Sequence, residues 1–599
     1  MKLSDYVVSF FENKGIKDVF MLSGGGCIHL VDSFGKSKIN YVCNLHEQAA
    51  SICAEAYAQY NNSPSLCLVT TGPGSTNTLT GVASAWLDSI PMIIISGQVQ
   101  RKDMKHNQGV RQIGFQEIDI VSIVKPITKY ATTVLDPDDI RITLEKAYHL
   151  ASSGRQGPVW IDIPLDIQSA QVDEKVLMGY ELPPTPNHMG ILKSKVSQIY
   201  EFINTSKRPV ILAGNGIRSA NAQAQFAELI EALNIPVLTT WKAIDFLDEK
   251  HPLFVGRPGI AAARGANFSQ QNSDLFISIG ARLDHGQTAY NHINFAREAK
   301  KVVVDIDAAE IDKMQFDIDC RVNFDARDFI EEMLLQKSNK YSRVDFSWWL
   351  AKCKEWQRKY PVVLPEYWEQ ETCVNNYVLI DVLSELLQPS DLLIPGSSGA
   401  CSEVTMQAFR TKAGMRIFNS EGLGSMGFGI PAAIGGCIAS GSQHTICIDG
   451  DGGFVMNIQE LETIRRLNLP IKFFVLNNSG YASIRNTQDK HFEQQVASGK
   501  SSGVTLPNIK KVANSYGIDY FKLESHKNIH QNVQKVLESN NPAICEVMML
   551  EAHTTMPRTS TYKDSNGNFV SAPMEDLYPF LPRDEFNANM IVDIIDNGV

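Results

Sequence analysis

Continuous apolar runs, rich in β-branched residues and bounded by Gly, Asp or Asn, recur along the chain and constrain its fold most strongly. Strands that are buried on both faces of a parallel sheet have this composition, because neither face meets water. The runs alternate with helical stretches, so the sequence predicts an α/β fold built from doubly wound parallel sheets. We expect strands at Ser65–Thr70, Met92–Ser96, Val210–Ala213, Leu275–Ile279, Val302–Ile306, Thr445–Ile448 and Lys472–Leu476.

The length of 599 residues is enough for about three or four domains. Two polar stretches, Val172–Gly190 with three prolines and Lys337–Tyr360, are typical of linkers. They predict domains at residues 1–170, 190–335 and 360–560, followed by a carboxyl-terminal tail at 561–599.

Charge and composition exclude several classes of function. A net charge of −11 with no basic run argues against nucleic acid or an anionic membrane as the main partner. No apolar run approaches the roughly 20 residues of a membrane span, and charges interrupt the amino terminus where a signal peptide would be apolar. The eleven cysteines form no C-x-x-C pair, which indicates reduced thiols and a cytoplasmic location.

The strongest local motif follows the run Thr445–Ile448. The segment Asp449–Phe454 leads into a helix, and a second apolar run then ends at Asn477 and Asn478. Because the two strands of such a βαβ unit are parallel, Asp451 and Asn478 leave the same edge of the sheet. Their oxygen atoms suit Mg²⁺ or Ca²⁺ rather than zinc.

Two bare glycines complete this motif. Gly452 and Gly453 leave backbone N–H groups exposed where a helix begins, which favours a phosphate. A metal beside such amides would clamp a diphosphate at the edge where open α/β sheets bind ligands. The alternative reading is a simple turn at the glycines and a helix entry at the asparagines.

A second candidate is Glu47, which precedes a helix rich in alanine. By itself, a glutamate at this place is more often a charge that stabilises the start of a helix. The sequence segments that surround Glu47 and follow it favour a different role for this residue.

The chain resembles the acetolactate synthase group of thiamine-diphosphate enzymes from Met1 to about Glu551. Gly452 and Asn477 are separated by 24 residues, 453–476, which matches the family's signature. The other matching segments are Asn44–Ala50, Thr71–Asn77, Trp86–Pro91, Ile95–Gln98 and Gly422–Pro431. The resemblance implies pyrimidine-binding, central and diphosphate-binding domains, with thiamine diphosphate and Mg²⁺ as cofactors.

The resemblance also implies roles for individual residues. Glu47 would hydrogen-bond the aminopyrimidine ring, Met426 would hold the two rings of the cofactor in a V, and Gln116 would be catalytic. The metal ligands would be Asp451, Asn478 and the backbone carbonyl of Gly480. The cofactor-binding set would be Pro73, Asn77, Met426, Gly450, Gly452, Gly453 and Asn478.

A flavin is expected in the central domain. A Gly-x-Gly such as 214–216 is weak alone, but several segments resemble those that contact FAD in acetolactate synthases. The residues implied are Arg155, Gly214, Gly216, Gly256, Arg282, Asp305 and Asp307. The alternative is a central domain that binds nothing, as in several pyruvate decarboxylases.

The sequence departs from the family where a small acceptor would be held. Gly286 stands in place of an arginine, Thr487 in place of a tryptophan and Leu165 in place of a lysine, whereas Phe115–Glu117 is retained. Loss of a carboxylate clamp and a bulky wall predicts a larger acceptor. The sequence therefore predicts a carboligase that decarboxylates pyruvate and transfers two carbons to a carbonyl acceptor such as a nucleotide-linked keto sugar.

Three alternatives stay open at this stage: acetolactate synthase, pyruvate oxidase with FAD as electron acceptor, and a cofactor-free structural subunit. The family implies active sites between subunits, so we expect a homodimer or homotetramer. The tail segment Met574–Phe586 could close over the site or serve only for packing.

Overall fold

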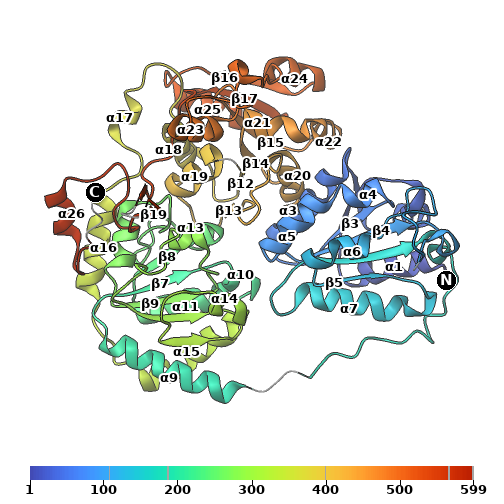
Figure 1. Cartoon of the computed structure of the whole chain (residues 1–599), viewed down its shortest axis with the longest axis horizontal. Coiled ribbons are helices and arrows are strands. Elements are labelled where there is room, and N and C mark those ends of the chain that lie inside the picture. Colours follow the sequence, from blue (N-terminus) through green and yellow to red (C-terminus); the bar gives the residue numbers. More distant parts are fainter. Residues whose placement is uncertain (107, 185–187, 398, 564–566, 596–599) are drawn as a thin grey trace.

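The computed structural model describes residues 1–106, 108–184, 188–397, 399–563 and 567–595, and it contains three large parallel β-sheets in succession along the chain (Figure 1). All strand pairs within these sheets are parallel, so the predicted α/β fold is confirmed. Within the described ranges, no helix combines the length and the apolar character needed to cross a bilayer.

The first unit is a sheet in the order β2-β1-β3-β4-β6-β5. Its strands are β1 (Asp18–Met21), β2 (Asn40–Cys43), β3 (Ser65–Val69), β4 (Met92–Gln98), β5 (Tyr130–Thr133) and β6 (Val159–Pro164). Its longer helices are α1 (Leu3–Asn13), α2 (Ile28–Gly35), α3 (Glu47–Asn61), α5 (Leu79–Leu87) and α7 (Ile140–Ser152). Every residue of β3, β4 and β6 is buried, which explains their continuous apolar sequences.

The central unit is a sheet in the order β11-β10-β9-β7-β8. Its strands are β7 (Pro209–Ala213), β8 (Val237–Thr239), β9 (Leu275–Ile279), β10 (Lys300–Val304) and β11 (Cys320–Val322). Its longer helices are α9 (Met189–Thr205), α11 (Gln223–Leu233), α12 (Arg264–Gln271), α15 (Ala326–Lys340) and α16 (Ser347–Lys359). The strand order reverses between β7 and β9, which creates a crevice at their carboxyl ends.

The third unit is a sheet in the order β13-β12-β14-β15-β17-β16. Its strands are β12 (Leu392–Pro395), β13 (Arg416–Ile417), β14 (Thr445–Gly450), β15 (Ile471–Asn477), β16 (Asp519–Leu523) and β17 (Ala543–Met548). Its helices include α18 (Asn376–Leu386), α19 (Gly399–Ala408), α20 (Gly429–Ala439), α22 (Leu461–Leu467), α23 (Ala482–His491), α24 (Ile509–Tyr516) and α25 (Ile529–Leu537). Each of the seven predicted strands lies in one of the three sheets.

Helices α3 and α20 join the first unit to the third (Figure 1). A Cβ built on Gly435 would overlap the backbone carbonyl of Cys53, so the two helices touch backbone to backbone. A single hydrophobic cluster runs through this contact and includes Phe20, Ile430 and Phe473. The first and third units therefore share one core.

The stretch 337–360 differs from its prediction as a linker. Most of it belongs to α15 and α16, and Trp349, Cys353 and Trp356 of α16 are fully buried. Their spacing places them on one face of the helix, which packs against α12. The abundant charged residues between them concealed this apolar face.

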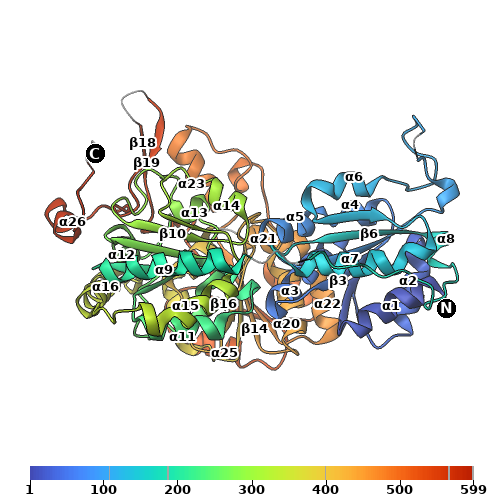
Figure 2. The same ribbon diagram turned by 90° about the horizontal axis from the view of Figure 1, so that it is seen from below.

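The carboxyl-terminal segment returns to the central unit (Figure 2). A short antiparallel pair, β18 (Thr561–Lys563) and β19 (Phe569–Ser571), precedes α26 (Arg583–Asn589). Asn589 Oδ1 accepts a 2.8 Å hydrogen bond from the indole of Trp356, and Arg297 pairs with the buried Glu575 at 2.7 Å. Residues 574–595 of the tail therefore pack on the central unit.

The fully buried Glu55 of α3 gives the fold a predictable pH dependence. Burial and the nearby Asp88 raise its pKa from 4.5 to about 8, so the folded protein holds a proton that the unfolded chain releases. As the pH rises from about 4.5 to about 8, the unfolded chain releases this proton and the folded protein keeps it. The free energy of unfolding should therefore fall by about 1.4 kcal/mol for each pH unit. Glu55→Gln mimics the protonated acid and should remove this slope.

Urea unfolding of parent and variant between pH 5 and pH 8 measures the difference. We expect the parent to lose stability relative to Glu55→Gln as the pH rises. A constant difference across this range would contradict the assignment.

Candidate active site

Two buried polar residues leave neighbouring strand ends of the third sheet. β14 and β15 pair in parallel up to Gly450 and Leu476, so Asp451 and Asn478 both follow at the same edge. Their side chains are only 4% and 6% exposed. The structure thus brings the two predicted metal ligands to one edge of the sheet.

The hydrogen bonding at this edge leaves oxygen atoms for a cation. The Asp451 carboxylate accepts bonds from the backbone N–H groups of Gly452 at 2.9 Å and Gly480 at 3.0 Å. Burial raises the pKa of Asp451 to about 6. The buried Oδ1 of Asn478 accepts no hydrogen bond from any described residue. Such an oxygen costs free energy unless a ligand pairs with it, so this edge fits Mg²⁺.

Glycines keep the same edge open. A Cβ on Gly452 would overlap the ring of Tyr481, and Met426 Cε lies 3.5 Å from that position. Gly480 has a φ of 130°, a conformation that glycine adopts readily and other residues rarely do. Gly450 ends β14 and Gly453 follows in α21 (Asp451–Phe454), so this part of the predicted cofactor-binding set lies together.

Arg485 of α23 was missed by the sequence analysis and lies beneath the loop that carries Asn478. Its guanidinium donates to the backbone carbonyls of Asn478 at 2.5 Å, Ser479 at 3.1 Å and Glu551 at 3.0 Å. The side chain is 6% exposed. A planar, always charged group with several donors is well suited to fix a loop in this way. An isolated arginine in a polar helix gives no sequence signal for this role.

The first sheet gathers the residues around Glu47. Glu47 is the first residue of α3 and is 7% exposed, and its Oε2 accepts a 3.0 Å hydrogen bond from Asn77. Pro73 begins α4 (Pro73–Thr76), which follows β3. Gln116 lies beside Gly72, since a Cβ on Gly72 would be 2.5 Å from the Gln116 carbonyl oxygen. The predicted residues of this unit therefore lie at the carboxyl ends of its strands.

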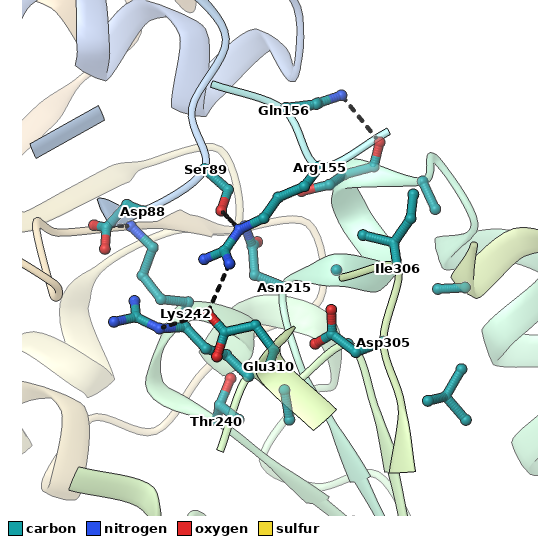
Figure 3. Close-up of a pocket in the computed structure, with 18 of the residues that line it drawn as sticks. Asp88, Ser89, Arg155, Gln156, Asn215, Thr240, Lys242, Asp305, Ile306 and Glu310 are labelled. Atoms are coloured by element: carbon teal, nitrogen blue, oxygen red, sulfur yellow. Dashed lines mark hydrogen bonds and ion pairs between the residues drawn. The ribbon is translucent and has the colours of Figure 1, made fainter. Parts of the chain in front are cut away.

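A separate cavity of about 980 Å³, including its mouth, lies where the three units meet (Figure 3). It opens at the ends of β7 and β9, which is the crevice of the central sheet. A Cβ on Gly216 would be 2.7 Å from Gly280 Cα, so the two loops approach without side chains between them. Gln156 lines the cavity, and its buried Oε1 has no partner among the described residues. The size and the unpaired acceptor suit a dinucleotide.

The predicted flavin residues are only partly gathered here. Arg155, Gly216, Arg282 and Asp305 line the cavity, and Gly214 adjoins the same pair of loops. Arg155 pairs with Asp307 at 2.8 Å and with Glu310 at 2.6 Å. Burial raises the pKa of Asp305 to about 6.

Gly256 is not at this cavity. It lines a different groove with Tyr360 and Trp368, and its backbone carbonyl accepts a 3.2 Å hydrogen bond from the N–H of Thr239 at the end of β8. Its positive φ of 118° and the nearby Cβ of Ala266 explain the glycine by local geometry.

Lys242 was also missed, and it joins all three units beside the cavity. Its ammonium donates to Asp88 Oδ2 at 3.0 Å and to the backbone carbonyl of Asn419 at 2.7 Å. Asp88 in turn accepts from the N–H groups of Glu421 and Gly422. Figure 3 shows Lys242 directed toward Asp88, and Arg155 toward Glu310.

Comparison with protein families gives the same three-part division. Models described as the thiamine pyrophosphate enzyme N-terminal TPP binding domain, central domain and C-terminal TPP binding domain match residues 1–123, 196–333 and 397–547. The chain is 32% identical over 584 residues to "Acetolactate synthase 3, chloroplastic" of Brassica napus, which covers 94% of this chain and 86% of the relative.

Two microbial relatives match to a similar extent. The "Probable acetolactate synthase large subunit" of Methanocaldococcus jannaschii is 32% identical over 563 residues, which are 92% of each chain. The "Acetolactate synthase isozyme 1 large subunit" of Escherichia coli is 31% identical over 547 residues, 91% of this chain and 93% of the relative.

The hydrogen bonds from Arg485 to the loop that carries Asn478 provide a test of the metal site. Arg485→Met should release the loop of Asn478 and weaken Mg²⁺ binding by about tenfold, the usual range for lost outer-shell support. Calorimetric titration with Mg²⁺ in the presence of a diphosphate ligand measures the affinity.

Arg257→Met is the matched control. Arg257 is 5% exposed and binds the carbonyls of Met406 and Phe409, away from Asp451. We expect this variant to lose stability and keep the parent's Mg²⁺ affinity. Equal losses of affinity in both variants would show that Arg485 acts only on stability.

Proposed function

We infer the function of this chain from one premise: it belongs to the thiamine pyrophosphate enzyme family, and it is similar to acetolactate synthase large subunits over most of its length. It is therefore a thiamine-diphosphate-dependent enzyme. When bound, this cofactor supplies a carbon nucleophile that adds to a 2-keto acid and takes up the electrons released by decarboxylation. We propose a carboligase that decarboxylates pyruvate and transfers the two-carbon unit to a nucleotide-linked keto sugar.

The observation that carries this proposal is the pair of small residues at the acceptor positions. Gly286 lies in α13 (His285–Thr288), and its backbone carbonyl accepts a 2.9 Å bond from Ile260. Thr487 lies in α23, and its hydroxyl bonds back to Ser483 of the same helix. Neither residue can grip a second 2-keto acid as an arginine and a tryptophan would.

The hairpin of β18 and β19 spans the same two regions. Asn291, just after α13, donates a 3.0 Å bond to the Ser571 carbonyl, and His491 of α23 contacts the Phe569 ring with centroids 6.2 Å apart. The hairpin would thus form a third wall of an acceptor site, with α13 and α23 as the others. A wide site of this kind fits a sugar better than a second pyruvate.

The residues at the strand ends of the third unit would bind the cofactor, and Glu47 of the first unit would take part in proton transfer. Asp451, Asn478 and the Gly480 carbonyl would hold Mg²⁺ against a diphosphate. Asn77 orients Glu47 through Oε2, and Oε1 would share a proton with the aminopyrimidine ring. Met426 would wedge between the two rings, and Gln116 would contact the 2-keto acid.

The cavity where the three units meet would hold FAD. Asp305 would accept ribose hydroxyls, and Arg155 and Arg282 would face the diphosphate. We assign this flavin a structural role, because the cavity lies among all three units. The family's arrangement further supports a homodimer or homotetramer with active sites between subunits.

Acetolactate synthase is the second candidate, and the names of the relatives favour it. The two candidates share the pyruvate donor and differ only in the acceptor. The acceptor therefore decides between them.

Product analysis separates the two candidates. Purified protein with thiamine diphosphate, Mg²⁺ and FAD would receive pyruvate, alone or with nucleotide-linked keto sugars, and mass spectrometry would identify the products. We expect slow pyruvate consumption that accelerates when the sugar is added, with a two-carbon branch on the product. Rapid 2-acetolactate formation from pyruvate alone would assign acetolactate synthase instead.

The acceptor residues can be exchanged directly. Gly286→Arg combined with Thr487→Trp restores the clamp and the wall, so acetolactate formation from pyruvate should rise by about 10- to 100-fold, the range for a gained carboxylate contact. Transfer to the sugar should fall in the same variant. Unchanged product ratios would mean that these two positions do not select the acceptor.

A further inference from the structure

A buried carboxylate of the third unit contacts the loop that leads into Glu47. Glu460 ends the 3₁₀ helix η6 (Val455–Glu460), and its side chain is 0% exposed. Its Oε1 accepts bonds from the backbone N–H groups of Leu45 at 2.7 Å and His46 at 3.1 Å. Its Oε2 accepts a 3.1 Å hydrogen bond from the Asn44 side chain. Glu460 therefore binds three consecutive residues of the first unit.

The remaining acceptor position of Glu460 is filled locally. Thr463 donates its hydroxyl to Oε2 at 2.7 Å. Both oxygens therefore have two donors each, which compensates the burial of a carboxylate that would otherwise be costly. A carboxylate with this set of donors fixes the loop 44–46 against the third unit.

Asn457 of the same η6 helix contacts Gln48, the residue that follows Glu47. Its Nδ2 donates to Gln48 Oε1 at 3.1 Å and to the Gly427 carbonyl at 2.8 Å. Asn457 is 1% exposed and breaks the helical conformation with φ −125° and ψ 34°, which suits a specific placement of its side chain. The bonds from η6 thus flank Glu47 in sequence and also reach Gly427, the neighbour of Met426.

We propose that Glu460 and Asn457 are positioning residues that hold Glu47 in its reactive orientation from the third unit. The inference rests on the proposed role of Glu47 and names the residues on which that role depends. Within the described part of the chain, Glu47 itself has few other restraints: Asn77 binds one oxygen, and the α3 cap is the His46 ring, which accepts from Gln48. A shift of the loop 44–46 would therefore displace the carboxylate.

A positioning role can be separated from a general loss of stability. The readout is the exchange of the C2 proton of bound thiamine diphosphate for deuterium, measured by acid quench and NMR with pyruvate absent. This rate reports only the proton transfer that Glu47 supports. Steady-state kcat and the KM for pyruvate are measured in parallel, together with the Tm of each variant.

Glu460→Ala should slow C2 exchange and kcat by about 10- to 100-fold, as displacement of a reacting group by roughly 1 Å does, while the KM for pyruvate changes by less than about twofold. Glu460→Gln should recover most of the rate, because its amide oxygen can still accept from Leu45 and His46. Asn457→Ala should slow exchange in the same direction, and it serves as the second variant if Glu460→Ala does not fold.

Glu55→Ala is the matched control. Glu55 is also fully buried and lies on α3, but it binds Ser84 and Gln59 instead of the loop before Glu47. We expect this variant to lower the Tm and to leave C2 exchange at the parent's rate. If Glu460→Ala and Asn457→Ala exchange as fast as Glu55→Ala at temperatures below every Tm, the positioning role is wrong.

Glu47→Gln separates the proposed role of Glu47 from the positioning role of Glu460 and Asn457. If this variant exchanges the C2 proton at the parent's rate, the proposed role of Glu47 fails, and this inference fails with it. If Glu47→Gln abolishes exchange and the Glu460 and Asn457 variants do not slow it, only the positioning role is overturned.

Discussion

Helices α3 and α20 touch backbone to backbone, and the arrangement of the other functional segments depends on this contact. Small residues make it possible: Gly435 faces the Cys53 carbonyl, and the Cys53 thiol donates to the Pro431 carbonyl at 3.1 Å. Glu47 begins α3, and Gly427 lies just before α20. Because Asn457 bonds to residues at both of these helix starts, we infer that the packing of the two helices sets the position of Glu47, the proposed activating carboxylate.

The central unit adds a second restraint between the first and third units. Lys242 binds the first unit through Asp88 and the third through the carbonyl of Asn419. The cavity for the proposed flavin opens beside it. A ligand there would contact all three units at once. A flavin could therefore stabilise the arrangement of the units without taking part in any redox step.

The sequence predicted those features that have a local pattern. The buried strands were predicted because both of their faces are apolar, and Asp451 and Asn478 were predicted because parallel strands end at one edge. Residues that act through long-range contacts had no such signal: Glu460, Arg485 and Lys242 are single charged residues in otherwise ordinary helices or turns. The same limit produced the incorrect linker at 337–360, where charged residues concealed the buried tryptophans.

We propose that the strand ends at Asp451 and Asn478 hold the diphosphate of the cofactor through a divalent cation. Anomalous diffraction from crystals of the full chain grown with thiamine diphosphate and Mn²⁺ in place of Mg²⁺ measures the position of the cation directly. We expect one strong manganese peak coordinated by Asp451, the unpaired Oδ1 of Asn478 and the Gly480 carbonyl. A peak coordinated by other residues, or cofactor density without manganese at this edge, would contradict it.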